Sequence, residues 1–105
     1  MKASELRIGN LIQIDIPNSY VESVTWEIIR DLEQDPQEDS FKPISLTEEW
    51  LKKFGFKYDV DTDCYHYYNF ILNKLFVMMD IDIHICIKYV HQLQNLYFAL
   101  TGEEL

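Results

Sequence analysis

The alternation of apolar and polar residues from Leu11 onward predicts a half-buried strand near the start of this 105-residue chain. Gly9-Asn10, just before it, favours a turn or a bulge. Pro17-Asn18-Ser19 then predicts a turn, because these residue types suit tight turns. We therefore expect one strand between the two turns.

The segment after the second turn allows two interpretations. Val24, Trp26 and Ile28 repeat at period two, which predicts a second strand that pairs with the first. Trp26, Ile29 and Leu32 instead follow helical spacing, so a helix is the competing interpretation. We expect the strand.

Residues 31–39 read DLEQDPQED, five acids and a proline without a base. Such a segment resists burial and does not extend a strand easily. It predicts an acidic loop over residues 31–42. Its role is either solvation, as is usual for a run of charge, or imitation of the negative charge of a nucleic acid towards a basic groove.

The segment SLTEEWLKKFGF at residues 45–56 predicts a short helix. Thr47 is suited to the N-cap, two acids follow it, two lysines come near the end, and Gly55 suits a left-handed C-cap. The buried face of this helix is expected to hold Trp50, Leu51 and Phe54.

The following residues favour strands. Residues 65–72 are aromatic and β-prone, and Asn73-Lys74 could close a hairpin into residues 75–79. Isoleucines at every second position in residues 81–87 predict a further half-buried strand. The join at Met79-Asp80 is either a turn or a bulge in one bent strand.

The last eighteen residues, 88–105, predict an amphipathic helix that ends at Gly102. Its core-facing stripe is expected to contain Tyr89, Val90, Leu93, Leu96, Tyr97 and Leu100. A second stripe lies on the other side of the helix and is a candidate partner-binding surface: His91, Gln94, Asn95 and Phe98.

Together these elements predict an α+β fold in one domain, residues 1–105. We expect a small, bent antiparallel sheet of about five to six strands, with a short central helix and the C-terminal helix packed on it. The composition is that of a globular protein, with 48% hydrophobic and 14% aromatic residues and only three glycines and three prolines.

The charge is strongly negative, with 18 acidic residues against 9 basic ones and a net charge of −9. This charge argues against direct binding to nucleic acid or to an anionic membrane, because both are negative themselves. It favours a basic protein partner, although solubility alone is the simpler explanation. The candidate acidic contacts lie in the predicted loop: Asp31, Glu33, Asp35, Glu38 and Asp39.

The chain contains two cysteines, Cys64 and Cys86, and no recognisable secretion signal or apolar run of membrane-spanning length. Two cysteines do not make a disulfide framework. We therefore expect a cytoplasmic protein with reduced thiols.

Two groups of potential metal ligands lack the rest of a metal site. Asp59, Asp61 and Asp63 begin like a calcium loop, but Cys64 and Phe70 stand where that loop needs glycine and glutamate, so we expect an acidic turn between strands. A second set lies on one face of a predicted strand, where flat neighbours do not converge on an ion: Asp80, Asp82, His84 and Cys86.

No arrangement of residues in the sequence indicates catalysis. Neither cysteine has an oxyanion loop and orienting acid around it, and phosphate-binding and dinucleotide-binding motifs are absent from the sequence. We therefore predict a protein that is not an enzyme and that uses no cofactor.

Three strings, LRIGN, ISLTEEWLKKFGF and IKYVHQLQNLYFALTGEEL, resemble a family of small acidic proteins carried by prophages and mobile elements of Gram-negative bacteria. The resemblance covers most of the chain and is most specific at the C-terminal string. It implies a phage-encoded protein without enzymatic activity that acts inside the host bacterium.

The nearest functional analogy is with anti-CRISPR proteins directed at the type VI-B RNA-guided ribonuclease, some of which come from the same bacterial group. By this analogy, the chain would bind the host effector and disturb its guide or target RNA handling. The alternative is an accessory protein of a mobile element that binds a host protein or self-assembles. We expect a monomer or a small homo-oligomer.

Overall fold

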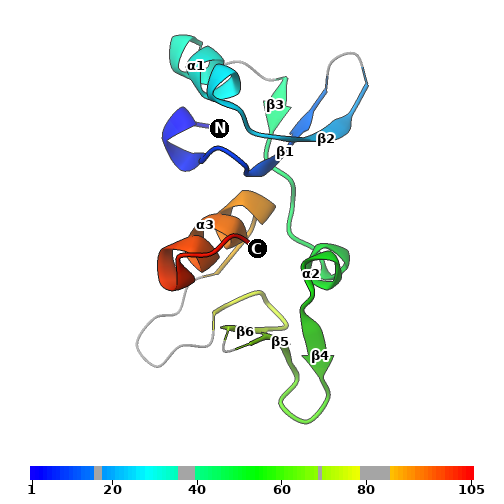
Figure 1. Ribbon diagram of the computed structural model, residues 1–105. Helices are drawn as coiled ribbons and strands as arrows, with labels where there is room; N and C mark the ends of the chain where they lie inside the picture. The colour runs from blue at the N-terminus through cyan, green and yellow to red at the C-terminus, as the bar shows by residue number, and fades with distance from the viewer. Residues whose placement is uncertain (16–17, 36–39, 69, 79–85) are drawn as a thin grey trace. The chain divides into compact units, whose positions relative to one another are not determined.

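The computed structural model describes residues 1–15, 18–35, 40–68, 70–78 and 86–105 of the chain (Figure 1). It divides into two compact units: unit 1 contains Met1–Ser45 and Tyr89–Glu104, and unit 2 contains Leu46–Lys88 and Leu105. Each unit has its own three-stranded antiparallel sheet. The fold class is therefore α+β, as predicted, whereas a single domain stays a prediction.

Within the described residues the strands form two small sheets of three strands each, and not the single larger sheet that the sequence predicts. In unit 1 the last strand of the sheet, β3 (Phe41–Lys42), pairs with only two residues of its neighbour. Pro43 follows directly and has no backbone N–H group to continue the ladder. The chain therefore leaves the first sheet at this point.

The sheet of unit 1 has the order β2-β1-β3. The central strand β1 (Leu11–Ile14) begins where the sequence predicts, after a turn at Gly9, and it buries alternate residues, Ile12 and Ile14. The edge strand β2 (Tyr20–Ser23) pairs with it antiparallel, and all four of its residues are exposed. A strand does pair with β1, but it is formed by Tyr20–Ser23 and not by the predicted residues Val24, Trp26 and Ile28.

Residues 24–28 do not form the predicted strand, because helix α1 (Trp26–Gln34) begins there. The Thr25 hydroxyl accepts the backbone N–H of Ile28 at 3.4 Å and caps the helix. Ile28 and Leu32, four residues apart, are both buried on one side of the helix. The competing helical interpretation is therefore the one that the structure confirms.

The same helix corrects the prediction of a loop at residues 31–34. These residues form the last turn of α1, because Leu32 is buried and anchors them to the core. Phe41 and Lys42, also assigned to the loop, form β3.

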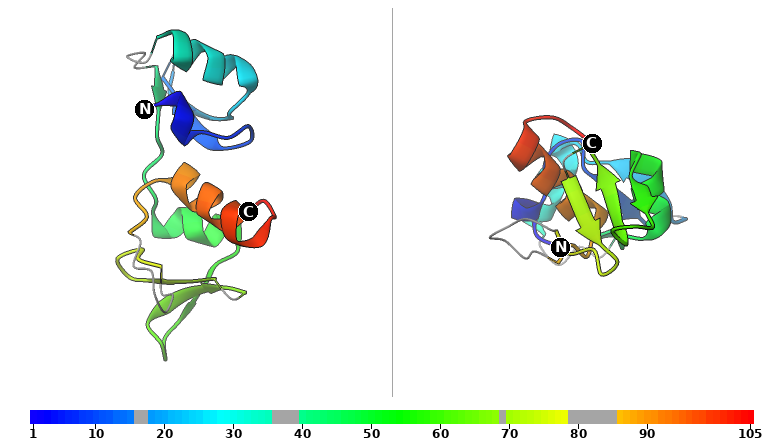
Figure 2. Two further views of the ribbon diagram at one scale, coloured as in Figure 1. Left: turned by 90° about the vertical axis from the view of Figure 1, so that its left-hand side faces the viewer. Right: turned by 90° about the horizontal axis from the view of Figure 1, so that it is seen from below.

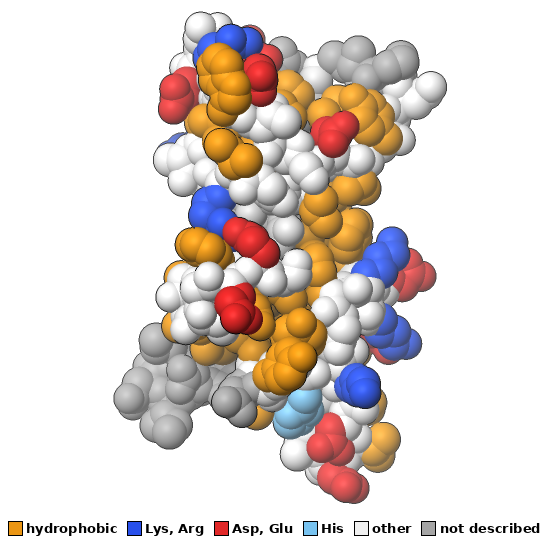
Figure 3. All heavy atoms as spheres, in the orientation of Figure 1, with side chains coloured by type: hydrophobic (Ala, Val, Ile, Leu, Met, Phe, Trp, Pro, Cys, Tyr) orange, Lys and Arg blue, Asp and Glu red, His pale blue; other side chains and the backbone are white. Residues whose placement is uncertain are grey.

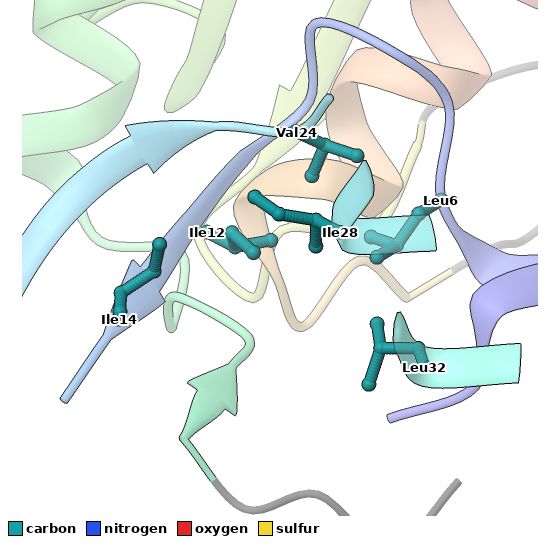
Figure 4. Close-up of a cluster of buried hydrophobic side chains, with 6 residues drawn as sticks. All are labelled: Leu6, Ile12, Ile14, Val24, Ile28 and Leu32. Carbon is teal, nitrogen blue, oxygen red and sulfur yellow. The ribbon is translucent and has the colours of Figure 1, made fainter. Parts of the chain in front are cut away.

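The core of unit 1 is a cluster of aliphatic side chains between α1 and the sheet (Figure 4). Leu6, which follows a short 3-10 helix, η1 (Ala3–Glu5), closes one side of it. The members are Leu6, Ile12, Ile14, Val24, Ile28 and Leu32.

Helix α3 (Val90–Thr101) is the C-terminal helix that the sequence predicts, and it ends at Gly102, which has a φ of 75°. It enters unit 1 where the Val90 N–H donates to the Ile44 carbonyl at 2.8 Å. Three residues of its predicted stripe, Val90, Leu93 and Tyr97, are buried. The other three are not: Tyr89 and Leu96 are half-buried, and Leu100 is exposed.

In unit 2, helix α2 (Glu48–Phe54) confirms the predicted short helix. The Thr47 hydroxyl accepts the Trp50 N–H at 3.4 Å, and Gly55 ends the helix with a φ of 100°. On the predicted buried face Leu51 is fully buried, while Trp50 and Phe54 are half-buried.

The sheet of unit 2 has the order β4-β5-β6, with its strands side by side in the right-hand view of Figure 2. Strands β4 (Lys57–Asp59) and β5 (Cys64–Tyr67) are joined by the predicted acidic turn, closed by the Asp63 N–H donating to the Asp59 carbonyl at 2.8 Å. Strand β6 (Phe70–Asn73) completes the sheet.

Residues 65–72 are divided between β5 and β6, because the chain turns at Tyr68, which has a φ of 52°. A turn does follow at Asn73, whose side-chain oxygen accepts the N–H groups of Leu75 and Val77 at 2.8 and 3.0 Å. The strand predicted at 81–87 and the join at 79–80 lie outside the described residues, except for Cys86 and Ile87.

Candidate protein-binding surface

The predicted partner-binding stripe of α3 is partly buried within unit 1. Gln94 is only 4% exposed, and its side-chain oxygen accepts the backbone N–H of Leu11 at 2.8 Å. His91 is only 1% exposed. These two side chains therefore do not face solvent, and the expectation of an exposed stripe is wrong for both. The partner of Gln94 belongs to a strand that lies about eighty residues earlier in the sequence.

Asn95 joins α3 to the N-terminal segment through three hydrogen bonds. Its side-chain oxygen accepts from Arg7 Nε at 2.9 Å and from Asn10 Nδ2 at 2.8 Å. Its side-chain nitrogen donates to the Glu5 carbonyl at 2.8 Å. These contacts give Asn95 a structural role that the sequence pattern does not reveal.

Arg7 has a central position in this network, and the sequence did not mark it as a site residue. Its guanidinium group donates to both carboxylate oxygens of Glu104, at 2.7 and 3.2 Å, and it lies 4.1 Å from the ring centre of Phe98. The hydrogen bonds from Arg7 lower the pKa of Glu104. Phe98 is 39% exposed and is covered on one face by Arg7.

His91 is a buried ring without hydrogen-bond partners among the described residues, for both of its nitrogens. It stacks on Tyr89, with ring centres 5.8 Å apart and planes 9° from parallel. Burial lowers the pKa of His91 below its ordinary value, whereas the Glu5 carboxylate acts in the opposite direction. His91 is therefore a neutral core residue near pH 7.

The negative charge of the chain is concentrated in unit 1. This unit contains four basic residues against eleven acidic ones, whereas unit 2 contains five against seven. Three of the four bases are engaged with acids: Arg7 with Glu104, Lys42 with Asp15 at 3.0 Å, and Arg30 with Asp31 at 3.6 Å. Hydrogen bonds from Gln13, Ser19 and Lys42 lower the pKa of Asp15 to about 2.

Helix α1 presents acidic residues at its C-terminal end. Asp31 and Glu33 are exposed in its last turn, Asp35 is the C-cap, and the last turn contains no base. The carbonyl groups at this end of a helix already carry partial negative charge. Figure 3 shows acidic side chains standing among hydrophobic ones over the part of the molecule that holds α1 and the first sheet.

A hollow of about 460 Å³ lies at this end of α1, and we call it the α1 hollow. Asp31 and Asp35, two of the predicted acidic partner contacts, lie there together with apolar side chains of the sheet. Glu33 does not line it, and Glu38 and Asp39 lie outside the described residues. The lining residues are Ile14, Tyr20, Asp31, Gln34, Asp35, Ser40 and Phe41.

Some of the potential metal ligands and both cysteines can also be placed in the described residues. In that part of the chain, no group of three or more His, Cys, Asp and Glu side chains is arranged to hold a metal ion. Of the four potential ligands on the predicted strand, which we expect not to converge on an ion, Asp80, Asp82 and His84 lie outside the described residues. Cys64 and Cys86 are free thiols, half-buried and exposed respectively.

A smaller hollow of about 290 Å³ lies in unit 2, lined by Gly55, Lys57, His66, Tyr67 and Tyr68.

No helix within the described ranges is long and apolar enough to cross a membrane. No family model, curated protein or solved structure matches this chain.

Proposed function

We propose that this chain is a non-enzymatic, acidic binding protein that engages a basic protein through the α1 side of unit 1. The observation that carries the proposal is the α1 hollow, where Asp31 and Asp35 stand beside apolar residues at the negative end of a helix. A surface of this kind attracts a basic group and also offers it apolar contact area.

The charge of unit 1 supports this choice of surface. Its eleven acids outnumber its four bases, and three of those bases already form ion pairs within the unit. The remaining excess of negative charge increases the rate of encounter with a basic partner and repels nucleic acid. A protein partner with a basic surface is therefore favoured over direct binding to RNA or DNA.

The specific target that we propose is a type VI-B RNA-guided ribonuclease in the cytoplasm of a host bacterium. This choice comes from the resemblance of the three sequence strings to prophage proteins. A nuclease of this type must hold its RNA in a basic channel, and an acidic protein would be steered to such a channel. Binding there would disturb guide or target RNA handling.

The test is binding and cleavage with a purified type VI-B ribonuclease loaded with its guide. We expect binding by biolayer interferometry that weakens at least tenfold between about 50 and 500 mM salt, because exposed charges are screened, together with loss of RNA cleavage. Asp31→Asn combined with Glu33→Gln should weaken binding. The matched control, Glu49→Gln combined with Asp61→Asn, removes the same charge from unit 2 and should not. Absence of binding at 50 mM salt would contradict this target.

Self-assembly is the second candidate, and the edge strand β2 favours it. All four residues of β2 are exposed, including Tyr20 and Val21 at 46% and 48%, and an uncovered edge can pair with another chain. Phe98 would belong to the contact if the accessory interpretation holds. Light scattering should then show an oligomer that Phe98→Ala or Val21→Lys dissociates, whereas a monomer at about 100 μM would exclude this candidate.

A further inference from the structure

We infer that the α1 hollow is an arginine-binding pocket, which receives one arginine side chain from the surface of the partner protein. This inference rests on the proposed function and names the group that the partner must supply. It follows from three features of the described residues: an apolar floor, a carboxylate rim and a helix end whose last turn contains acids and no base.

The floor of the α1 hollow is apolar and partly aromatic. Ile14 and Phe41 come from the central and last strands of the sheet, and Tyr20 comes from its exposed edge. Arginine has a three-carbon stem that packs on apolar surface while its charged end stays near water. Its guanidinium group also binds favourably to the faces of aromatic rings.

The rim of the hollow carries two carboxylates one helical turn apart. The Asp35 N–H donates to the Asp31 carbonyl at 2.9 Å, which places these residues on successive turns at the end of α1. Both side chains line the hollow. A guanidinium group presents five N–H donors in a planar fork, so it can bind two carboxylates where an ammonium group acts as a single point of charge.

The end of α1 also lacks a basic residue of its own in the last turn. Helices are stabilised by cations at the C-terminus, yet the last turn of α1 contains acids and no base. The nearest internal cation is Arg30, which lies 3.6 Å from Asp31 and stacks on Trp26. Both members of this ion pair are about half-exposed, so the pair is weak and does not replace an external cation.

The hollow also has the right chemistry to prefer arginine over lysine. An ammonium group is strongly hydrated, and placing it on an apolar floor removes part of its water. A guanidinium group is more weakly hydrated and stacks on rings. We therefore expect the order arginine, then lysine, with neutral citrulline last.

The test is a titration of the ¹⁵N-labelled full chain with N-acetyl-arginine methylamide, followed by NMR at low salt. Shifts should be confined to the lining residues, and the lysine and citrulline analogues should bind at least threefold and tenfold more weakly. Asp31→Asn should weaken arginine binding at least fivefold. Glu33→Gln is the matched control, because it removes the same charge from the same helix outside the hollow. Phe41→Leu should weaken binding while the dispersion of the spectrum confirms the fold.

Failure of the pocket can be distinguished from failure of the proposed function. Equal binding of citrulline and arginine, shifts spread over both units, or equal effects of Asp31→Asn and Glu33→Gln would overturn the arginine pocket. If the chain then still bound the basic nuclease in a salt-dependent way, the proposed function would stand without it. If the pocket bound arginine but no nuclease bound, only the proposed target would fall.

Discussion

Replacing His91 by phenylalanine should make the protein more stable, and most strongly at acidic pH. His91 is 1% exposed, and both of its ring nitrogens have no partner among the described residues. An unsatisfied buried polar group costs about 1–3 kcal/mol of folding free energy. Phenylalanine removes both polar atoms and keeps an aromatic ring for the stack on Tyr89. We expect a gain of about 1–3 kcal/mol at pH 8, less any cost of the larger ring.

The pH dependence provides a second measure that does not depend on ring size. Because burial lowers the pKa of His91 in the folded chain, the unfolded chain binds the proton more readily. Stability therefore rises with pH, and it is lost as the pH falls below the ordinary histidine value of about 6.5. The loss approaches about 1.4 kcal/mol per pH unit until the folded chain is also protonated. The phenylalanine variant lacks this contribution, so its advantage should grow between pH 8 and pH 5.

The assay is urea denaturation of both proteins at pH 8, 7, 6 and 5, followed by tryptophan fluorescence and circular dichroism. Comparing the two proteins at each pH cancels the contributions of all other titrating groups. His91→Leu serves as a second variant with a side chain closer in size to histidine. A difference in unfolding free energy that stays constant between pH 8 and pH 5 in both variants would refute the assignment of His91 as a buried neutral residue.

Three further predictions concern other contacts. Arg7→Lys should lower the unfolding free energy by about 1–2 kcal/mol, because lysine cannot reproduce the fork and the stack of arginine; an unchanged denaturation midpoint would argue against this network. Gly55→Ala should cost more than about 1 kcal/mol, because its φ is +100° and the new Cβ would lie 3.0 Å from Tyr67, and a neutral result would be inconsistent with the left-handed cap. The pKa of Asp15 is lowered to about 2 by its hydrogen bonds and by Lys42, so the stability that it contributes is present above pH 4 and is lost between about pH 4 and pH 2. Asp15→Asn should therefore flatten the acid unfolding curve in that window, and an unchanged curve would exclude this contribution.

The sequence predicts best those elements whose capping residues or alternating apolar residues lie within a few positions of one another. Helix α2 has its N-cap at Thr47 and its left-handed C-cap at Gly55, and the structure confirms both. Strand β1 shows the same local character, since alternate burial follows directly from its alternating residues. These features need no information from distant parts of the chain.

The segment around Val24 shows where local patterns become ambiguous. Val24, Trp26 and Ile28 fit a strand, while Trp26, Ile29 and Leu32 fit a helix, and the sequence alone does not choose. Packing in the core favours the helix, because a helix buries Ile28 and Leu32 together with Ile12. Asp31 and Glu33, on either side of Leu32, belong to that helix for the same reason, although the composition of the segment is typical of a loop.

For the candidate site, too, some features follow from the sequence and others only from the tertiary structure. The sequence by itself determined the fold class, the caps of α2, the end of the C-terminal helix at Gly102 and the excess of acid. Only the tertiary structure decided that Gln94 and Asn95 are joined to β1 and Arg7, and that Asp31 and Asp35 meet Phe41 around one hollow. The physical reason is that these contacts depend on how packed elements bring side chains together, in several cases from opposite ends of the chain.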